Sequence, residues 1–399
     1  MRRIAVYGGG NKALDVEMIL AKYLRNEAEC RFAVENKQME KIGTYMRSKL
    51  DAEKSLEIIS LDACVQKYRD REIDGVVFPT SYHLFDWREI YGLCIGRGIA
   101  KQDIFAVPID ILKKKELDQD DISRILTPYG DLNQIYHLDI HIIENCNLKC
   151  KGCAHFSSLV TEKDTAVSLE DYLENLQKLK SLVPNICHIA LLGGEPLLHP
   201  ELGEIIKITG EIYPYAQIGV VTNGILIPKL SEECYQLMRQ YGVKVMISKY
   251  PAFQKMEEIW TKALEAHEVP YKIHDFSEFE RRLWKEPIFN GALMTKRCGH
   301  DLCMKDHYIS RCPMTAFIHY YNSYFGKSFP DNGKVDICKM SSGKELLEEL
   351  EKPSGLCDYC CARDQCLEQW DAVTEKTIQA GDWLMTNIDS LKIERGEIL

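Results

Sequence analysis

Strand-like and helix-like stretches alternate through two long parts of the chain. In residues 1–112, short apolar runs such as "RIAVYG" and "GVVF" are separated by stretches with apolar residues at helical spacing, among them "ALDVEMILAKYL". A βαβ succession of this kind predicts parallel strands covered by helices. We therefore expect an α/β fold, with a Rossmann-like domain over residues 1–112.

A second series begins at "HLDIHII", residues 137–143. The stretch "SLEDYLENLQKLKSLV" places its leucines on one helical face, with Ser168 and Asp171 as a capping-box start. The runs "HIALL", "QIGVV", "VKVMI" and "YKIHDF" are typical of strands, and helical stretches lie at 201–211, 229–241 and 253–266. Repeated βα units predict a full or partial (β/α)6-type barrel over 134–297, with chemistry at the C-terminal ends of the strands.

The rest of the chain lacks this rhythm. Residues 113–133 are polar, charge-rich and aperiodic, which predicts a linker. Residues 298–370 are rich in cysteine and predict a small separate domain of short segments. Residues 371–399 form the predicted tail. Most of the predicted helical stretch "WDAVTEKTIQAGDWLM", residues 370–385, lies in this tail.

Composition restricts the environment and the partners. Of 399 residues, 45% are hydrophobic and 28% are charged, and the formal net charge is −10. No apolar run reaches the length of a membrane span, and the first residues lack a signal-peptide pattern. No basic tract suited to nucleic acid is present. We expect a cytoplasmic protein that binds neither membranes nor nucleic acid as its main partner.

The sixteen cysteines are unevenly distributed. Five stand among apolar neighbours and are interpreted as buried thiols: Cys30, Cys64, Cys94, Cys187 and Cys234. The other eleven gather at 146–153 and 298–366. Clustering in a reducing compartment indicates metal binding rather than disulfides.

The tight group, "CNLKCKGC", follows a predicted strand and spaces Cys146, Cys150 and Cys153 as C-x3-C-x2-C. A [4Fe–4S] cluster has four ligand positions and takes thiolates, so one loop supplies three of them. A zinc site completed by His155 is the alternative, although zinc sites more often use paired C-x2-C units.

This motif, directly after a strand that opens a βα barrel, resembles the radical S-adenosylmethionine (radical SAM) superfamily. The resemblance implies that the three cysteines hold a [4Fe–4S] cluster whose fourth iron binds S-adenosylmethionine. It also implies a reductase partner such as flavodoxin or ferredoxin. An electron from the cluster then cleaves the cosubstrate, and the 5′-deoxyadenosyl radical abstracts a hydrogen atom.

Residues at the following strand ends carry the resemblance further. Gly193, Gly194 and Glu195 in "LLGGEPLLHP" match the family's GGE motif, where glycines allow close approach and the carboxylate accepts bonds from a cationic amine. Three polar residues resemble family positions that contact the methionyl carboxylate or the ribose: Thr222, Asn223 and Ser248.

One position departs from the family. Many members carry an aromatic residue near the adenine just before the third cysteine, and here that residue is Gly152. The adenine contact is therefore expected from His155 or Phe156.

The Cys-rich region resembles the Twitch and SPASM domains, which carry auxiliary clusters. "CDYCCARDQC" gives C-x2-C-x5-C, but Trp370 stands where the next SPASM cysteine is expected. One auxiliary [4Fe–4S] cluster is therefore implied, with zinc as the alternative. The expected ligands are Cys303, Cys312, Cys357 and Cys360. Cys338 is their rival, because Gly333-x4-Cys338 fits the family's G-x4-C element.

Three further thiols, Cys298, Cys361 and Cys366, are candidates to return a hydrogen atom to a substrate radical, as in radical epimerases. The alternative for each is a packed thiol without a chemical role.

The N-terminal part carries a glycine-rich turn. "VYGGGNKA" places Gly8, Gly10 and Ala13 as G-x-G-x-x-A between a strand and a helix, and Glu35 ends the next strand. Such a turn either binds a dinucleotide or only packs closely. The part resembles Rossmann-like modules of nucleotide-sugar and polysaccharide enzymes, which implies a nucleotide-linked substrate.

The hypothesis from sequence is a radical SAM enzyme acting on a C–H bond of a carbohydrate or polyol, nucleotide-linked. The surplus thiols favour epimerisation over dehydrogenation. A maturase of a ribosomal peptide and a zinc-bearing binding protein are the alternatives.

Overall fold

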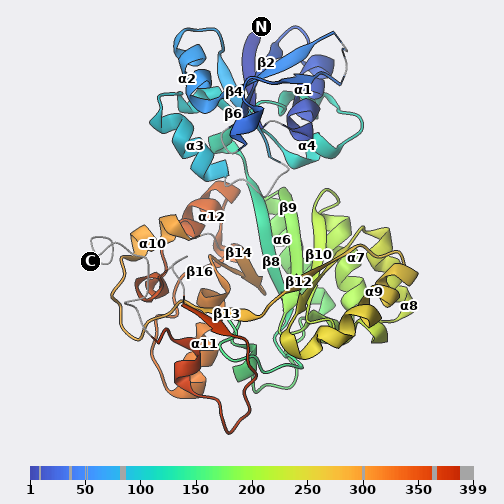
Figure 1. Cartoon of the computed structure of the whole chain (residues 1–399), viewed down its shortest axis with the longest axis vertical. Coiled ribbons are helices and arrows are strands. Elements are labelled where there is room, and N and C mark those ends of the chain that lie inside the picture. Colours follow the sequence, from blue (N-terminus) through green and yellow to red (C-terminus); the bar gives the residue numbers. More distant parts are fainter. Residues whose placement is uncertain are drawn as a thin grey trace. The chain divides into compact units, whose positions relative to one another are not determined.

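The computed structural model describes residues 1–8, 10–35, 38–49, 51, 53–80, 87–298, 302–361 and 366–386. The chain divides into two compact units (Figure 1). The first contains Met1–Tyr136 and Asn185–Cys187, and the second contains His137–Pro184 and the residues from His188 onwards.

The first unit is built on a sheet with the strand order β3-β4-β2-β1-β5-β6-β7. Its five inner strands run parallel, and β3 and β7 pair antiparallel at the two edges. The inner strands are rich in Val, Ile and Ala and are buried on both faces, which is typical of a parallel sheet covered by helices. The strands are β1 (Arg2–Tyr7), β2 (Ala28–Glu35), β3 (Tyr45–Arg47), β4 (Ser55–Ser60), β5 (Gly75–Pro79), β6 (Ile104–Val107) and β7 (Thr127–Pro128). The α-helices are α1 (Asn11–Tyr23), α2 (Leu61–Arg69), α3 (Trp87–Gly96), α4 (Ile109–Lys113) and α5 (Gln119–Ser123).

The linker expected at residues 113–133 is part of this unit, so that prediction is wrong. Ile125 is fully buried in the unit's core, and Ile122 packs against it. The charges that made the stretch look solvated bind one another, since Lys114 Nζ lies 2.6 Å from an Asp121 carboxylate oxygen. The charged groups of the stretch are thus paired, and its apolar side chains pack into the core of the unit.

The second unit contains a sheet with the order β12-β11-β10-β9-β8-β14-β15-β16. The strands β9 to β12 are parallel neighbours in chain order, and β8 lies beside β9 in the sheet. The connecting helices α7, α8 and α9 lie to the right of the strands in Figure 1. The strands are β8 (Gln134–Ile143), β9 (Asn185–Gly193), β10 (Gln217–Thr222), β11 (Lys244–Lys249) and β12 (Tyr271–Asp275). The helices are α6 (Leu169–Leu182), α7 (Leu202–Ile212), α8 (Glu232–Gln240) and α9 (Glu257–Ala266). The α/β class with a partial barrel and a further domain is confirmed.

The start of the Cys-rich region extends this sheet. β14 (Leu302–Lys305) and β15 (Tyr308–Ser310) form an antiparallel hairpin, in which Cys303 lies opposite Ser310. β14 also pairs in parallel with β8, and β15 pairs with β16 (Lys334–Asp336). The hairpin is therefore continuous with the barrel sheet.

The remaining described elements follow β12 in the chain. They are α10 (Gly291–Arg297), α11 (Pro313–Phe325), α12 (Gly343–Leu350) and a two-stranded sheet of β13 (Glu278–Arg281) and β17 (Cys366–Gln369). The helix predicted over 370–385 is wrong: the described residues there contain only the 3-10 helix η10 (Ala380–Trp383). Ala372 instead forms an antiparallel bridge with Cys150, so this backbone bonds the cysteine loop rather than itself.

Two smaller predictions can be compared directly. The five scattered cysteines are all buried, as expected. None of the described helices is long and apolar enough to cross a membrane.

Candidate active site

Three cysteines converge on a cavity of about 510 Å³ at the C-terminal ends of β9, β10 and β11. Cys146, Cys150 and Cys153 all line it. The loop that carries them starts after β8, where Thr165 Oγ1 accepts the backbone N–H groups of Glu144 and Asn145, both at 2.9 Å. The volume is in the usual range for a small-molecule site, about 300–1,000 Å³.

The C-terminal segment, residues 370–383, crosses this loop. The N–H of Lys151 donates to the Asp371 carbonyl at 2.9 Å, and the N–H of Val373 donates to the Lys149 carbonyl at 2.8 Å. The indole of Trp383 donates to the Cys153 carbonyl at 2.9 Å. Backbone and side-chain bonds thus fix the loop from both sides.

The three thiols differ in their electrostatics. Burial raises the pKa of Cys150 to about 12, and burial also raises the pKa of Cys146. Burial acts in the same direction on Cys153, but hydrogen bonds from His155 and from backbone N–H groups lower the pKa of that thiol overall. Three thiols on one loop fit the donor set of an iron–sulfur cluster, and Cys153 is the one most readily present as thiolate.

The two glycines of the GGE motif are required by the cysteine loop. A Cβ on Gly193 would lie 1.9 Å from the Ile143 carbonyl oxygen, and one on Gly194 would lie 2.2 Å from the Asn145 carbonyl oxygen. We expected these glycines to admit a ligand. They line the cavity, but the nearest atoms that exclude a side chain belong to the loop backbone.

Glu195 follows these glycines and is 1% exposed. One carboxylate oxygen accepts the Thr222 hydroxyl at 2.6 Å, and the other accepts the Asn223 N–H at 2.9 Å. Burial raises the pKa of Glu195 to about 7, although these hydrogen bonds oppose the shift. A carboxylate held this way is a suitable partner for a cationic group.

The remaining strand-end residues lie in the same cavity. Thr222, Asn223 and Ser248 line it together with Glu195, because adjacent parallel strands end at one edge of the sheet. Asn223 Nδ2 donates to Asn147 Oδ1 at 2.7 Å and so ties β10 to the cysteine loop. The structure brings these residues together, and their binding roles stay predictions.

Gly152 has φ +66°, and no side chain fits there. A Cβ would lie 2.0 Å from Arg281 Nη1 and 2.5 Å from the Asp382 carbonyl oxygen. Arg281 is itself buried and donates to the Lys151 carbonyl at 3.2 Å. The Arg281 guanidinium therefore fills the space where a side chain at position 152 would begin.

The two residues expected to replace that aromatic differ in position. His155 lines the cavity, whereas Phe156 does not. Phe156 is fully buried and packs against Tyr321 and Trp383, so an adenine contact from it is not supported. Tyr250, which the sequence interpretation missed, does line the cavity. The signal was an aromatic residue two positions after Ser248 at a strand end.

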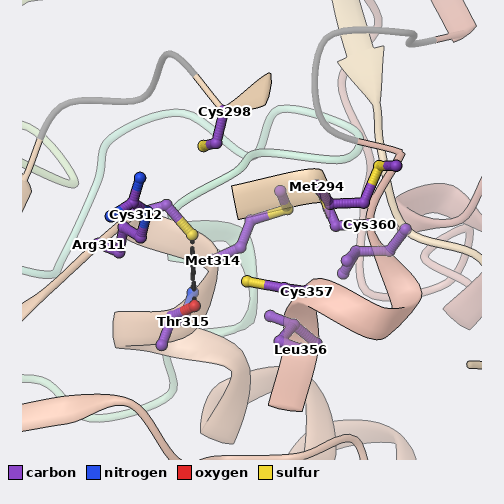
Figure 2. Close-up of a pocket in the computed structure, with 10 residues that line it drawn as sticks. Met294, Cys298, Arg311, Cys312, Met314, Thr315, Leu356, Cys357 and Cys360 are labelled. Carbon is purple, nitrogen blue, oxygen red and sulfur yellow. Dashed lines mark hydrogen bonds between the residues drawn. The ribbon is translucent and has the colours of Figure 1, made fainter. Parts of the chain in front are cut away.

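Four other cysteines surround a smaller cavity of about 30 Å³ (Figure 2). They are Cys298, Cys312, Cys357 and Cys360. Cys312 caps α11, and its sulfur accepts the Thr315 N–H at 3.4 Å. Burial raises the pKa of Cys312 to about 11; Thr315 opposes this, and Cys298 and Cys357 add to it.

This set differs from the ligands expected from spacing, and the ligand set stays a prediction. Cys303 lies near enough to Cys312 to interact electrostatically but is fully buried in an apolar cluster and does not line the cavity. Its strand pairs on both sides, with β8 and β15, which fixes the face its side chain takes. Cys338 is exposed and lies apart from the cavity lining. Among the described side chains, no three His, Cys, Asp or Glu groups are close enough to hold a single metal ion.

The two cavities share part of their walls. Leu283 and Met314 line both. Of the thiols expected to donate hydrogen, Cys298 lines the smaller cavity, and Cys361 is fully buried beside Phe289 and lines neither. The side chain of Cys366 lies outside the described part of the chain.

The glycine-rich turn of the first unit lies between β1 and α1. Gly8 has φ +107°, and its N–H donates to the Val34 carbonyl on β2 at 2.7 Å. Gly10 precedes α1 as its N-cap, and Glu35 ends β2 and is buried. β1 and β2 are parallel neighbours, so the three residues lie at one edge of the sheet. Whether they bind a nucleotide stays a prediction.

Part of the barrel matches a known protein family. Residues 140–248 match the family "Radical SAM superfamily". A "GTP 3',8-cyclase" from Microcystis aeruginosa is 32% identical over 111 residues, which are 26% of this chain and 32% of that protein. "Molybdenum cofactor biosynthesis protein 1" from Homo sapiens is 29% identical over 227 residues, 54% of this chain and 32% of that protein. The matches thus span about a third or less of these curated relatives.

Among solved structures, BtrN in complex with AdoMet and 2-DOIA is similar with a TM-score of 0.39 and 17% identity, over 63% of this chain and 98% of that one. The superfamily to which the barrel sequence matches uses a [4Fe–4S] cluster with S-adenosylmethionine, and the thiols of the larger cavity fit that group. Residues 140–248 of the chain thus form a radical SAM domain.

Proposed function

We propose that the chain is a radical SAM enzyme that removes a hydrogen atom from the sugar or polyol part of a nucleotide-linked substrate. Cys146, Cys150 and Cys153 hold its [4Fe–4S] cluster. When bound, the cluster and S-adenosylmethionine supply a 5′-deoxyadenosyl radical, which abstracts the hydrogen atom. The observation that carries the proposal is the convergence of the three thiols with the strand-end polar groups on one cavity.

The chain's own residues position the cosubstrate in this proposal. The Glu195 carboxylate binds the methionyl ammonium group, and Asn223 and Ser248 contact the carboxylate or the ribose. Glu195 is oriented by Thr222 and by the Asn223 N–H, so little reorganisation is needed when the ligand arrives. Tyr250 lines the cavity and supplies an aromatic face for the adenine.

Two features support a nucleotide-linked substrate. Curated relatives bear the name GTP 3',8-cyclase, which names a nucleotide and a ribose position. The first unit also presents Gly8, Gly10 and Glu35 at the edge where nucleotide-binding α/β folds hold phosphate and ribose. A backbone turn at the N-terminus of α1 suits a diphosphate.

We further propose that Cys298, Cys312, Cys357 and Cys360 hold one auxiliary [4Fe–4S] cluster. Four thiolates close all its ligand positions, which suits electron transfer. The smaller cavity shares Leu283 and Met314 with the larger one, which favours an electron passing from a substrate radical to this cluster. The substrate would lose a hydrogen atom, a proton and that electron, and an alcohol carbon would become a ketone.

Epimerisation instead needs a thiol that faces the substrate. Neither Cys298 nor Cys361 lines the larger cavity, so the support that surplus cysteines gave to epimerisation is reduced. We therefore propose dehydrogenation as the outcome, with epimerisation as the result to be tested against it.

Anaerobic reconstitution with iron and sulfide tests the class. A brown protein that cleaves S-adenosylmethionine to 5′-deoxyadenosine under dithionite is expected, and a Cys146→Ala variant should not cleave it. A colourless, zinc-only protein would refute the proposal. With nucleotide sugars and GTP as substrates, one 5′-deoxyadenosine per ketone indicates dehydrogenation, whereas solvent deuterium at the reacting carbon indicates epimerisation.

A further inference from the structure

Trp370 stands at the position where the SPASM pattern would place a cysteine, and its indole is directed at the cysteine loop. Its Nε1–H donates to Cys150 Sγ at 3.3 Å. The backbone next to the indole, just after β17, bonds two other segments. The N–H of Trp370 donates to the Ser277 carbonyl at 2.7 Å, and the N–H of Lys151 donates to the Asp371 carbonyl. The contact is therefore imposed by the pairing of β17 with β13 and by the bridge at Ala372.

The ring is also held in orientation. It stacks on Tyr250 with a centroid separation of 5.3 Å and an interplanar angle of 19°. Tyr250 in turn contacts Phe279 of β13, edge-on at 5.8 Å. A half-buried tryptophan clamped at its backbone and on its face keeps its N–H aimed at one acceptor.

The other two sulfurs accept hydrogen bonds from within their own loop. Cys146 Sγ accepts the Leu148 N–H at 3.3 Å, and Cys153 is bonded by His155 and by nearby backbone N–H groups. Among the described residues, the donor to Cys150 comes from a segment more than two hundred positions away. A side-chain donor, unlike a backbone one, can be removed by substitution.

We infer that Trp370 is a positioning residue that sets the reduction potential of the cluster on Cys146, Cys150 and Cys153 through its hydrogen bond to Cys150 Sγ. The inference rests on the proposed function. A thiolate ligand becomes more negative when the cluster is reduced, so a donor to its sulfur stabilises the reduced state more than the oxidised state. Trp370 thus makes the cluster easier to reduce.

Trp370→Phe removes the N–H and keeps a ring that can stack on Tyr250. The expected result is a more negative midpoint potential in an EPR-monitored titration of the reconstituted full chain. At the wild-type midpoint the ratio of reduced to oxidised cluster should fall about five- to tenfold, the scale of one typical hydrogen bond. The signal is assigned to this cluster by its change on addition of S-adenosylmethionine.

Trp383→Phe is the matched control. It also removes an indole N–H beside the loop, but that N–H is bonded to the Cys153 carbonyl and not to a sulfur. The midpoint potential of this variant should stay within a twofold change in that ratio. An equal shift in both variants would contradict the inference, since it would indicate general loosening of the loop.

A second measurement detects the indole nitrogen itself and starts from the wild-type protein. The chain has five tryptophans, and ¹⁵N labelling of the indole nitrogens should give one nitrogen coupled to the S-adenosylmethionine-responsive signal in pulsed EPR. The coupling should persist in Trp383→Phe and disappear in Trp370→Phe. A responsive cluster without this coupling overturns the inference alone, whereas absence of any responsive cluster overturns the proposed function and the inference with it.

Discussion

At the scale of single residues, Glu195 combines its proposed binding role with an energetic cost. Its buried carboxyl has a pKa raised to about 7, against an ordinary value of 4.5. A carboxyl with a raised pKa favours folding most at low pH, and this advantage is lost as pH rises through about 7. The charged form that would bind the cosubstrate is thus the form that the folded protein stabilises least.

Glu195→Gln should therefore have opposite effects on stability and on binding. Without cofactors, the variant should have a higher free energy of unfolding than wild type. This difference should grow from pH 5 to pH 8 and approach roughly 3 kcal/mol, because one pKa unit corresponds to about 1.4 kcal/mol. Its affinity for S-adenosylmethionine should fall by tenfold or more. Denaturant unfolding and equilibrium binding measure the two effects. Glu348→Gln, at an exposed position on α12, should change neither; a pH-independent difference for Glu195→Gln would refute the explanation.

Gly152 is the residue where the absence of a side chain is most strictly required. Gly152→Ala adds a Cβ that meets the Arg281 guanidinium and the Asp382 carbonyl at a positive φ, so we expect a loss of roughly 3 kcal/mol or more and a low iron content after reconstitution. Gly242 has a similar φ of +61° and open space around it. Gly242→Ala should cost only about 1 kcal/mol. If both variants lost the same unfolding free energy, the contact with Arg281 would not contribute to the cost of Gly152→Ala.

At the scale of elements, the hairpin of β14 and β15 decides which cysteines can act together. Because β14 joins the barrel sheet beside β8, Cys303 turns into the apolar cluster around Phe317, and Cys298 reaches the smaller cavity from the end of α10. Cys303 is therefore kept out of the smaller cavity, whereas Cys298 lines it.

This assignment predicts different iron contents for two serine variants. Cys298→Ser should lose up to half the iron of the reconstituted protein, since it removes a ligand of one of two four-iron clusters. Cys303→Ser should retain the iron, although it is expected to lose stability by burying a hydroxyl. Iron analysis and the visible spectrum measure both. If Cys298→Ser retained its iron and Cys303→Ser lost iron, Cys303 would be the ligand, as the cysteine spacing predicts.

The elements also show how far the sequence can be interpreted. The barrel strands and helices are recognisable because apolar periodicity and caps such as Ser168 are local signals. The cavity residues Glu195, Asn223 and Ser248 follow from them, because parallel strands end together. The packing of residues 113–133 and the extended path of 370–383 are not local properties: their backbone and apolar groups bind partners far away in the chain. Arg281 filling the space beside Gly152 leaves no sequence signal at all.

At the scale of the whole molecule, the chain combines two units with separate sheets and separate candidate sites. The second unit contains both thiol-lined cavities. The first unit carries the turn at Gly8 and Gly10, where α1 begins without a side-chain cap or an acidic residue in its first turn. A helix N-terminus of this kind leaves backbone N–H groups for an anion.

Two substitutions at Gly10 separate phosphate binding from helix capping. Gly10 has an extended backbone, and a Cβ there would meet nothing within 4 Å, so side chains fit. Gly10→Asp and Gly10→Asn both cap α1 and should each leave stability unchanged or raised by a few tenths of a kcal/mol. Only Gly10→Asp places a negative charge where a diphosphate would bind, so it should weaken binding of UDP-glucose or GTP to the full chain by tenfold or more, while Gly10→Asn should weaken it far less. Calorimetric titration and thermal unfolding measure both properties. If the two variants bind these nucleotides equally well, the turn only packs β1 against α1, and the nucleotide part of the substrate must be recognised by the second unit.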